Sequence, residues 1–275
     1  MSGSSKLVLL GVGQTARAVV NHFSGQSALE IWGTTRGTSG AALAELGIKP
    51  ILLDQQRQWQ ETLARVCRDA YVLVSFPPGD NSDQVFSEIV FASEPQAVVY
   101  ISSTGVYGKT EGVIDENSAV DESDSRALVR LNAERIWAAK STVLRAPGLY
   151  NAKSGLHQRL LSGTYRLPGD GLNHVSRIHL DDFAAIIAKV FVTQSQLARQ
   201  TYVVGDLKPA SHLEVVTWLC KQLSLPLPAA APLSEVNPSL RGNRQIRAAQ
   251  ILADLDFELK YPTYVEGFTQ CLASL

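Results

Sequence analysis

The sequence has few of the features that mark secreted, membrane-spanning or nucleic-acid-binding proteins. Its three cysteines, Cys67, Cys220 and Cys271, are far apart and lack metal-ligand spacing, so we expect buried free thiols. No apolar run reaches the roughly 18 residues that span a bilayer, and residues 1–5 lack the long apolar region of a signal peptide. A formal net charge of −1 gives no general attraction to nucleic acid or membrane. These absences indicate a cytoplasmic protein without a metal centre, whose partners are small molecules.

Apolar runs alternate with amphipathic segments along the chain, and its 275 residues suffice for a large core. We expect strands over residues 7–10, 29–33, 48–53, 70–76, 97–102, 142–146 and 201–205. We expect helices over residues 41–46, 59–67, 82–92, 126–135, 155–162, 212–223 and 248–255, and one from Gln14 onward. Strand–helix units in series predict an α/β protein with a doubly wound parallel sheet and right-handed crossovers.

A glycine-rich turn follows the first predicted strand. Gly11 permits the tight turn from strand to helix, and a side chain at Gly13 would block a pyrophosphate from the backbone N–H groups. The helix that begins near Gln14 would face that pyrophosphate with unpaired donors and a partial positive charge, and Ala16 allows close packing of helix on strand. The G-x-G-x-x-A pattern therefore predicts dinucleotide binding, although such a turn can also be only a tight connection.

The end of the second strand indicates which dinucleotide binds. Arg36 follows Thr34 and Thr35 there, and no carboxylate lies nearby. An arginine at this place accommodates a 2′-phosphate, whereas an acidic residue binds the ribose hydroxyls of NAD. We therefore predict NADP as the cofactor, with NAD as the alternative if Arg36 is only a solvated loop residue.

Two further features lie at the carboxyl edge of the predicted sheet. Asp54 follows the third strand, where its carboxylate either caps the next turn or accepts a hydrogen bond from the adenine amino group. Pro77 and Pro78 end the fourth strand after Phe76. This stiff loop either only ends the strand or presses on the cofactor.

Hydroxyl-bearing residues and glycines follow the fifth strand. The run from Ser102 to Gly108 reads Ser-Ser-Thr-Gly-Val-Tyr-Gly, which resembles the Ser-Ser-x-x-Val-Tyr-Gly signature of extended short-chain dehydrogenases/reductases, the nucleotide-sugar epimerase and dehydratase group. Similar segments follow in the family's order at residues 113–116, 144–150, 177–184 and 261–267. The resemblance covers nearly the whole chain. It implies a Rossmann domain over residues 1–150 and a smaller substrate lobe over residues 151–275, packed as one extended unit.

One part of the family's catalytic pattern is missing. The family uses a serine or threonine, a tyrosine and a lysine four residues later, and Ser103 matches the serine that holds the substrate oxygen. Counting back in steps of four from Glu134, which matches a family glutamate, places Arg130 at the lysine position and Arg126 at the tyrosine position. Arginine stays protonated and cannot act as the usual acid–base group. The chain therefore resembles the atypical branch of the family, which keeps the fold and the glycine turn but lacks the Tyr-Lys pair.

Two residues are candidates for the missing proton donor, each with a structural alternative. Tyr107 lies near the sheet edge, but it also suits a packed aromatic of the Val-Tyr-Gly turn. His179 titrates near neutral pH, but it also suits a hydrogen-bonded wall residue at a strand-to-helix junction. We expect Asp181 to cap the helix that starts there.

The remaining candidate residues are cationic or lie in loops. Arg126 and Arg130 either bind phosphate or carboxylate groups from one helix face or pair with the acidic residues at positions 121, 122 and 124. Arg177 resembles a family contact to substrate phosphate, with a surface salt bridge as the alternative. Pro147 lies in the loop that the family places beside the nicotinamide. The predicted cofactor contacts are Gly11, Gly13, Gln14, Thr15, Thr35, Arg36, Asp54, Phe76, Pro77, Ser102 and Pro147, and the predicted substrate contacts are Thr104, Arg126, Arg130 and Arg177.

These residues predict an NADP-binding oxidoreductase that acts on a sugar-nucleotide-like or other hydroxyl-bearing substrate held by Ser103. The alternative is a regulatory protein that senses NADP(H) or a nucleotide without turning it over, because intact binding elements without a proton-transfer pair fit that role too. Family dimers use the helices near residues 82–92 and 121–138, so we expect a monomer or a homodimer.

Overall fold

The computed structural model describes residues 5–23, 29–36, 40–53 and 58–275. The chain divides into two compact units, Met1–Ser102 with Val129–Leu144 and Ala184–Thr201, and Ser103–Leu128 with Arg145–Phe183 and Tyr202–Leu275. Each unit has a hydrophobic core cluster of its own. Within the described ranges, no helix is both long enough and apolar enough to cross a bilayer.

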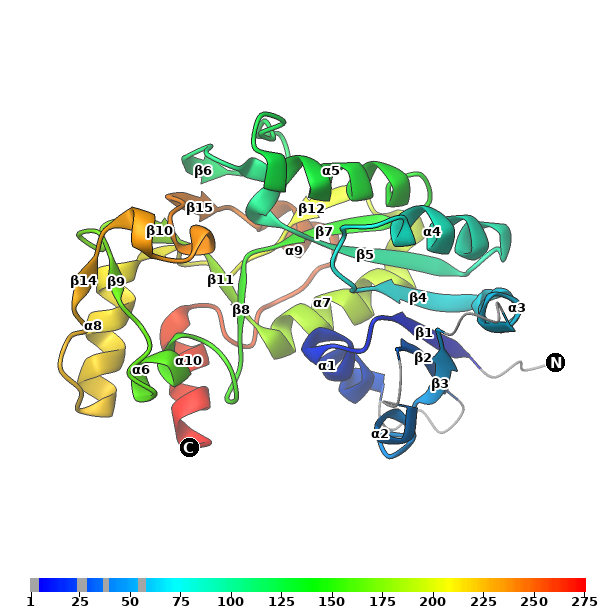
Figure 1. Cartoon of the computed structure of the whole chain (residues 1–275), viewed down its shortest axis with the longest axis horizontal. Coiled ribbons are helices and arrows are strands. Elements are labelled where there is room, and N and C mark those ends of the chain that lie inside the picture. Colours follow the sequence, from blue (N-terminus) through cyan, green and yellow to red (C-terminus); the bar gives the residue numbers. More distant parts are fainter. Residues whose placement is uncertain (1–4, 24–28, 37–39, 54–57) are drawn as a thin grey trace. The chain divides into compact units, whose positions relative to one another are not determined.

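A seven-stranded sheet has the strand order β12-β7-β5-β4-β1-β2-β3 (Figure 1). Its strands are β1 (Lys6–Leu10), β2 (Glu30–Thr35), β3 (Lys49–Leu52), β4 (Ala70–Val74), β5 (Ala97–Ser103), β7 (Thr142–Ala146) and β12 (Thr201–Val203). The pairs that join β5, β4, β1, β2 and β3 are parallel. From β1 the chain winds outward through β2 and β3, and then in the other direction through β4 and β5. The predicted doubly wound parallel sheet is confirmed, and its winding reverses between β1 and β4, the place where sheets of this kind bind ligands at the carboxyl ends of the strands.

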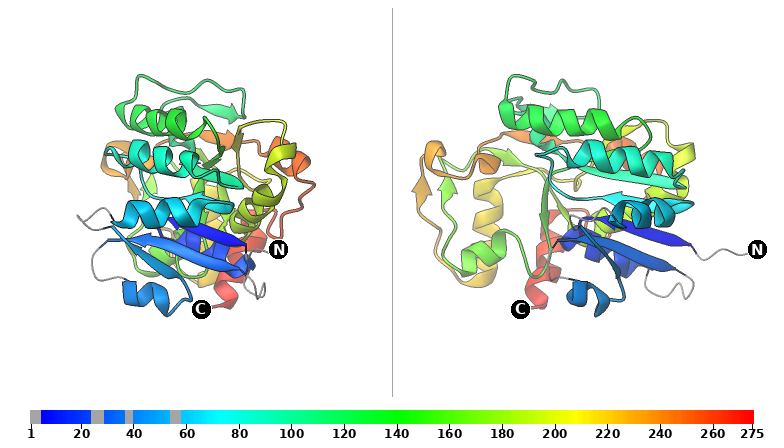
Figure 2. Two further views of the ribbon diagram at one scale, coloured as in Figure 1. Left: turned by 90° about the vertical axis from the view of Figure 1, so that its right-hand side faces the viewer. Right: turned by 45° about the vertical axis from the view of Figure 1, so that its right-hand side comes forward.

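Helices cover both faces of this sheet. They are α1 (Gln14–Phe23), α2 (Gly40–Ala44), α3 (Gln58–Cys67), α4 (Ser82–Ala92), α5 (Ser125–Trp137) and α7 (Leu180–Thr193). On β4, Tyr71 lies 6.5 Å from Phe23 of α1 and 5.2 Å from Phe191 of α7, measured between ring centroids. The next residue, Val72, shares a core cluster with Phe86 of α4. Because successive strand residues point to opposite faces, this alternation places α1 and α7 on one face and α3 and α4, which lie side by side in Figure 2, on the other.

A buried polar contact fixes α5 against α4 in the first unit. Trp137, the last residue of α5, stacks on Tyr100 of β5 with ring centroids 6.0 Å apart. Its indole Nε1 donates to Asp83 Oδ1 of α4 at 2.7 Å. Burial raises the pKa of the Asp83 carboxyl, while the hydrogen bond from Trp137 opposes that rise. The indole N–H therefore satisfies a carboxyl group that would be costly to bury alone.

The second unit is built from two-stranded sheets and short helices. The sheets pair β6 (Gly112–Ile114) with β15 (Arg244–Ile246), β8 (Gly148–Tyr150) with β11 (Arg177–His179), β9 (Leu167–Pro168) with β14 (Ala230–Ala231), and β10 (His174–Val175) with β13 (Ala210–Ser211). The helices are α6 (Leu156–Leu161), α8 (His212–Leu223), α9 (Ala249–Asp254) and α10 (Tyr264–Ala273). Tyr150 of β8 packs on Phe268 of α10 with ring centroids 4.3 Å apart. This contact ties the C-terminal helix to the strand that follows the Pro147 loop.

Several element bounds agree with the sequence, among them the helices over residues 82–92 and 212–223. The strand predicted over residues 29–33 was too short. It continues through Thr34 and Thr35 because both residues keep their parallel pairing with β3. The end of β2 therefore lies directly before Arg36.

Candidate functional site

The glycine turn after β1 is held by the two neighbouring strands. Gly11 has a φ of 89°, and a Cβ there would lie 3.0 Å from the backbone nitrogen of Phe76, which follows β4. The Gly11 N–H donates to Thr34 Oγ1 at 2.9 Å, and the Ser75 hydroxyl donates to the Gly11 carbonyl at 2.7 Å. Position 11 therefore requires glycine for its backbone conformation and for space.

At position 13, neither the backbone conformation nor a lack of space requires a glycine. Gly13 is exposed, and a Cβ built on it would meet no atom within 4 Å. Helix α1 begins at the next residue, Gln14, and Arg17 N–H donates to the Gly13 carbonyl at 3.1 Å. Amides of the first turn, such as that of Thr15, have no acceptor within a helix. The fold thus leaves an open approach to the helix N-terminus that a side chain at Gly13 would fill.

Three residues that shape this turn were missed by the sequence-based prediction: Gly33, Thr34 and Ser75. A Cβ on Gly33 would lie 2.6 Å from Cγ2 of Val12, so this glycine makes room for the turn itself. Thr34 and Ser75 supply the two hydrogen bonds to Gly11. All three lie at the carboxyl ends of β2 and β4, the strands that flank β1, and a polar or glycine residue at those strand ends is the signal that could have identified them.

The cation predicted to select NADP is on the surface. Arg36 is exposed and directly follows Thr35, the last residue of β2. The pKa of the Asp80 carboxyl is lowered mainly by hydrogen bonds from Ser82, and the Arg36 charge lowers it as well. Arg36 thus lies within electrostatic range of the loop after β4. Asp54, the other residue predicted near the adenosine, lies outside the described residues.

The proline loop after β4 begins with a ring held in place by packing. Phe76 lies 5.4 Å from Phe86 and 6.5 Å from Trp137, measured between ring centroids. Pro77, the next residue, is exposed. The loop therefore leaves the sheet from a fixed position beside Gly11, and it presents Pro77 to solvent at the carboxyl edge.

The hydroxyl run at the end of β5 divides into buried and accessible members. Ser102 and Thr104 are buried, and the Ser102 hydroxyl has no hydrogen-bond partner among the described residues. The half-buried Ser103 accepts the Gly105 N–H at 3.1 Å, which caps the short 3₁₀ helix η2 (Thr104–Tyr107). A serine Oγ that accepts a hydrogen bond still carries an O–H to donate. Ser103 can therefore donate to a substrate oxygen while it holds the turn.

Tyr107 is enclosed rather than open to a ligand. Its side chain has no exposed surface, and its hydroxyl donates to the Asp115 carbonyl at 3.2 Å and accepts from Arg145 Nη1 at 3.0 Å. The Arg145 guanidinium also lies 5.2 Å from the centre of the Tyr107 ring. These contacts favour the packed-aromatic interpretation of Tyr107 over the role of proton donor.

The two arginines at the family's tyrosine and lysine positions both lie on α5. Arg126 is exposed and Arg130 is half-buried. Among the described residues, neither forms an ion pair with the acidic residues at 121, 122 and 124, and Asp124 instead caps the helix by accepting the N–H groups of Arg126 and Ala127, each at 2.9 Å. The predicted alternative, pairing of the two arginines with residues 121, 122 and 124, is therefore not seen among the described residues, and the charge of Arg130 instead acts on the buried Asp83 carboxyl of α4.

Arg177 lies in a buried polar cluster instead of on the surface. It pairs in β11 with Gly148, next to the half-buried Pro147, and its guanidinium lies 5.8 Å from the centre of the Tyr264 ring. Within the described part of the chain, its side chain makes no hydrogen bond and Nη1 is fully buried. The Tyr150 hydroxyl and Asp206 Oδ2 are also buried without a partner among the described residues. Burial raises the pKa of Tyr150, so its hydroxyl is neutral, and the charge of Arg177 opposes the rise in the pKa of Asp206. The surface salt bridge considered for Arg177 is absent.

The buried carboxyl of this cluster gives a pH-dependent prediction. Burial raises the pKa of Asp206 from 3.8 to about 7, despite the opposing charge of Arg177. Between these values the folded state binds the proton and the unfolded state does not, so the stability contributed by this group falls as pH rises from about 4 to about 7, by at most about 1.4 kcal/mol per pH unit.

Asp206→Asn should lack this component, because an amide resembles the protonated carboxyl and does not titrate. Urea unfolding at pH 5 and pH 8 measures the effect, and the variant should gain stability relative to the wild type as pH rises. Asp182, whose pKa is also raised by burial, is present in both proteins and cancels in the difference. Parallel pH profiles of the two proteins would contradict the prediction.

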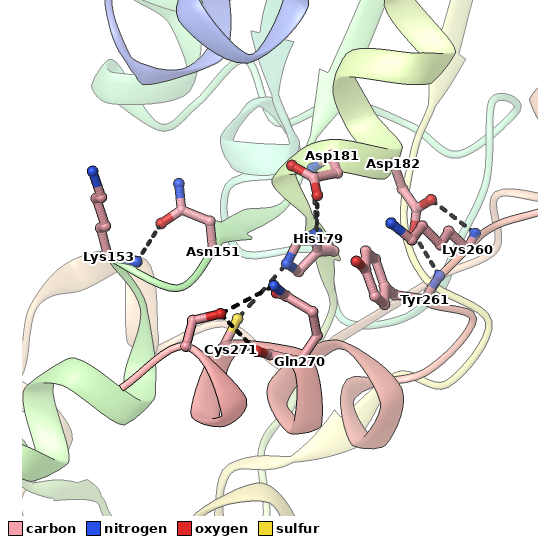
Figure 3. A network of polar contacts seen from close by, with 10 residues as sticks. Asn151, Lys153, His179, Asp181, Asp182, Lys260, Tyr261, Gln270 and Cys271 are labelled. Atoms are coloured by element: carbon pink, nitrogen blue, oxygen red, sulfur yellow. Dashed lines mark hydrogen bonds and ion pairs between the residues drawn. The ribbon is translucent and has the colours of Figure 1, made fainter. Parts of the chain in front are cut away.

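His179 is buried, and its ring lies beside that of Tyr261 (Figure 3). Its ring lies 4.1 Å from that of Tyr261 and 5.2 Å from that of Tyr150, and its Nε2 lies 3.7 Å from Cys271 Sγ. Burial lowers the pKa of His179, while Asp181 and other neighbours oppose the shift. The imidazole is therefore uncharged at neutral pH, and its position matches the wall-residue interpretation.

The prediction that Asp181 caps the following helix is wrong. Helix α7 begins at Leu180, and His179 Nδ1 accepts the Asp181 N–H at 3.3 Å, so the residue before the helix supplies the cap. Asp182 performs a different function: it accepts the N–H groups of Lys260 and Tyr261 at 2.8 and 2.9 Å, which ties α7 to the segment before α10 (Figure 3).

All three cysteines are buried and free, as predicted. Burial raises the pKa of both Cys67 and Cys271 to about 12. Because the thiolate is the reactive form, these side chains are chemically inert packing residues at neutral pH.

No protein-family model matches the chain, and no curated protein matches its sequence. Solved structures are similar over almost its whole length. A conserved protein of unknown function from Silicibacter pomeroyi is 26% identical with a TM-score of 0.82, and the match covers 98% of this chain and 99% of that one. The human epimerase family protein SDR39U1, solved with NADPH, is 14% identical with a TM-score of 0.76, and the match covers 98% of this chain and 100% of that one.

MoeE5, solved with UDP-glucose and NAD, is 18% identical with a TM-score of 0.75, and the match covers 98% of each chain. The chain therefore has the α/β fold of the epimerase/dehydratase structures, which confirms the resemblance at the level of the fold.

Proposed function

We propose that this protein binds NADP(H) at the turn between β1 and α1. The observation that carries the proposal is the contrast between Gly11, which is confined by Phe76, and Gly13, which faces open space at the helix N-terminus. The first glycine shapes the turn, and the second has no conformational or packing role within the protein that would require a glycine. A diphosphate that approaches the backbone N–H groups explains the absence of a side chain at position 13. Structures of the same fold were solved with NAD or NADPH.

The residues around the turn suit the parts of this cofactor. The backbone at Gly13, Gln14 and Thr15 would hold the diphosphate, and Thr35 and Arg36 would hold the adenosine ribose with its 2′-phosphate. The remaining predicted contacts, Phe76, Pro77, Ser102 and Pro147, stay proposals on the same basis.

Replacing the surface cation tests the cofactor choice. Arg36→Asp should weaken NADP binding about 10- to 100-fold, because a charge-assisted contact to the 2′-phosphate is replaced by repulsion. NAD lacks that phosphate, so its affinity should change much less. Calorimetric titration of the wild type and the variant with NADP, NADPH and NAD measures both effects. Failure of all three to bind the wild type at millimolar concentration would remove the proposed function, and equal losses for NADP and NAD would remove only the role of Arg36.

We further propose that the protein is an oxidoreductase acting on a hydroxyl-bearing, sugar-nucleotide-like substrate. Bound NADP(H) supplies hydride transfer at the nicotinamide ring. Ser103 would donate its hydroxyl to the substrate oxygen, next to Thr104 in the same turn. Arg126 and Arg130, which lack acidic partners at 121, 122 and 124, would bind phosphate or carboxylate groups. Arg177, whose side chain is buried, would attract the same groups through its charge and not through a direct contact. The free thiols agree with a cytoplasmic location.

A second candidate function, sensing of NADP(H) without turnover, is favoured by the burial of both candidate proton donors. Tyr107 is enclosed with its hydroxyl bonded on both sides, and His179 is buried and uncharged at neutral pH. Neither candidate proton donor is presented to a ligand. A protein that senses NADP(H) without turnover would show this combination. Oxidation of NADPH, followed by the absorbance of the reduced nicotinamide ring with hydroxyl-bearing and keto substrates, separates the two, because a sensor binds the cofactor but never consumes it.

A further inference from the structure

The loop that follows β4, from Phe76 to Asp83, is anchored in the interior of the first unit at both of its ends. The Phe76 ring packs against those of Phe86 and Trp137, with centroids 5.4 and 6.5 Å away. The Asp83 carboxyl, in the first turn of α4, is buried and accepts the Trp137 indole N–H at 2.7 Å. One side chain, that of Trp137, therefore contacts both ends of the loop.

The middle of this loop faces solvent. Pro77, Gly79, Asp80 and Asn81 are exposed. Asp80 Oδ1 accepts the Ser82 N–H at 2.8 Å, which is a contact inside the loop. Within the described part of the chain, no hydrogen bond joins the segment from Pro77 to Asp80 to a residue outside the loop. The position of the loop therefore depends on its two anchored ends.

The orientation of the Trp137 ring is fixed by its neighbours. The ring has no exposed surface and stacks on Tyr100 of β5, with centroids 6.0 Å apart and 12° between the ring planes. Phe91 of α4 meets it edge-on at 5.6 Å. The indole N–H is the only hydrogen-bond donor of a tryptophan side chain, and it donates to Asp83. The ring cannot turn without losing this bond or the stacking on Tyr100.

The anchored loop begins beside the glycine turn proposed to bind the cofactor. A Cβ on Gly11 would lie 3.0 Å from the backbone nitrogen of Phe76, and the Ser75 hydroxyl donates to the Gly11 carbonyl at 2.7 Å. Pro77, a proposed cofactor contact, is the second residue of the loop and is exposed. A loop that is already held at both ends need not be ordered when a ligand binds, which favours affinity.

We infer that Trp137 is a positioning residue for the NADP(H) site, because it holds the loop from Phe76 to Asp83 in place beside the glycine turn. The inference rests on the proposed function, and it gives the end of α5 a role in cofactor binding that is separate from that of the arginines earlier in the helix. The indole–carboxyl hydrogen bond is the contact that substitution removes most selectively, because Trp137→Phe keeps an aromatic ring at this position.

Two pairs of variants isolate this hydrogen bond. Trp137→Phe removes the donor and Asp83→Ala removes the acceptor, and each should raise the dissociation constant for NADP about 10-fold, because the loop must then be ordered during binding. Asp83→Asn loses the same charge as Asp83→Ala but keeps an oxygen that accepts the indole N–H, so it should bind NADP as the wild type does. Trp218→Phe, in α8 of the second unit, is the matched control for Trp137→Phe and should leave the affinity unchanged.

The backbone order parameters of Gly79, Asp80 and Asn81, measured by nuclear magnetic relaxation without nucleotide, report on the loop directly. They should fall in Trp137→Phe and Asp83→Ala and stay at the wild-type value in Asp83→Asn. A residue that only stabilised the fold would lower Tm without changing the order of this loop. Calorimetric titration at a temperature where circular dichroism shows each variant to be folded measures the affinities.

Wild-type affinity for NADP in Trp137→Phe and Asp83→Ala would overturn the inference, and so would unchanged order parameters in these variants. An equal loss in Asp83→Asn and Asp83→Ala would also overturn it, because the charge and not the hydrogen bond would then carry the effect. If Trp137→Phe does not fold, the two Asp83 variants decide the question. A wild type that binds none of NADP, NADPH and NAD would instead remove the proposed function, while the order parameters would still test whether Trp137 holds the loop.

Discussion

Gly13→Asp is expected to abolish NADP binding while the protein stays as stable as the wild type. Aspartate is among the best residues at the position before a helix, and its charge is favourable beside the helix N-terminus. A Cβ at position 13 meets no atom within 4 Å beyond the neighbouring residues of the chain, so the side chain starts into open space. The same carboxylate fills the space proposed for a diphosphate and repels it, and we expect an affinity loss of about 100-fold or more.

The measurement is a calorimetric titration with NADP together with thermal unfolding. Ser211→Asp adds the same charge at the N-cap of α8 in the other unit and should leave the affinity unchanged. Gly11→Ala, in contrast, should lower the stability of the fold. Its Cβ would lie 3.0 Å from the Phe76 backbone, and alanine is strained at the φ of 89° that Gly11 has. If Gly13→Asp bound NADP as tightly as the wild type does, the proposed diphosphate site would be excluded.

Gly267→Ala is expected to destabilise the protein by about 3 kcal/mol, as overpacking of a core does. In an isolated helix the same change would stabilise by about 1 kcal/mol, because alanine is the better helix former. Gly267 is buried in α10 against Tyr150, and a Cβ there would overlap the Tyr150 hydroxyl and lie 2.8 Å from Cζ. The Tyr150 ring packs against His179 and Phe268, so it can move away from the new methyl group only by disturbing those contacts.

Urea unfolding of a double-mutant cycle measures this contact. Tyr150→Phe removes the hydroxyl, so Gly267→Ala should cost less in that background than in the wild type. Thr269→Ala, on the exposed side of the same helix, is the matched control and should be neutral or slightly stabilising. Independent effects at positions 150 and 267 would show that α10 accommodates the methyl group without pressing on Tyr150.

Features that depend on a few consecutive residues could be predicted from the sequence. The glycine turn could be predicted because a strand, two glycines and a helix start lie within a few consecutive residues, and their geometry follows from backbone constraints. The parallel sheet could be predicted because strand and helix patterns alternate. The predicted end of β2 was less accurate, because the pairing of β2 with β3 continues past Gly33.

Side-chain environments could not be predicted in this way. Tyr107 follows a family signature, yet its hydroxyl is bonded to Arg145, which lies 38 positions further along the chain. Asp181 had the right residue type for a helix cap, but the ring of His179 accepts its N–H instead. Both outcomes depend on contacts that no spacing rule describes.

The sequence by itself determined the strands of the seven-stranded sheet, the helices between its first five strands and the position of a backbone turn suited to a diphosphate, because these follow from local periodicity and from the conformational freedom of glycine. Only the tertiary structure decided that Phe76 confines Gly11, that Arg177 is buried near Asp206 and Tyr150, and that Trp137 contacts both Phe76 and Asp83. The physical reason is that burial and electrostatic neighbours are properties of packing between distant segments, which the residue types along one segment do not contain.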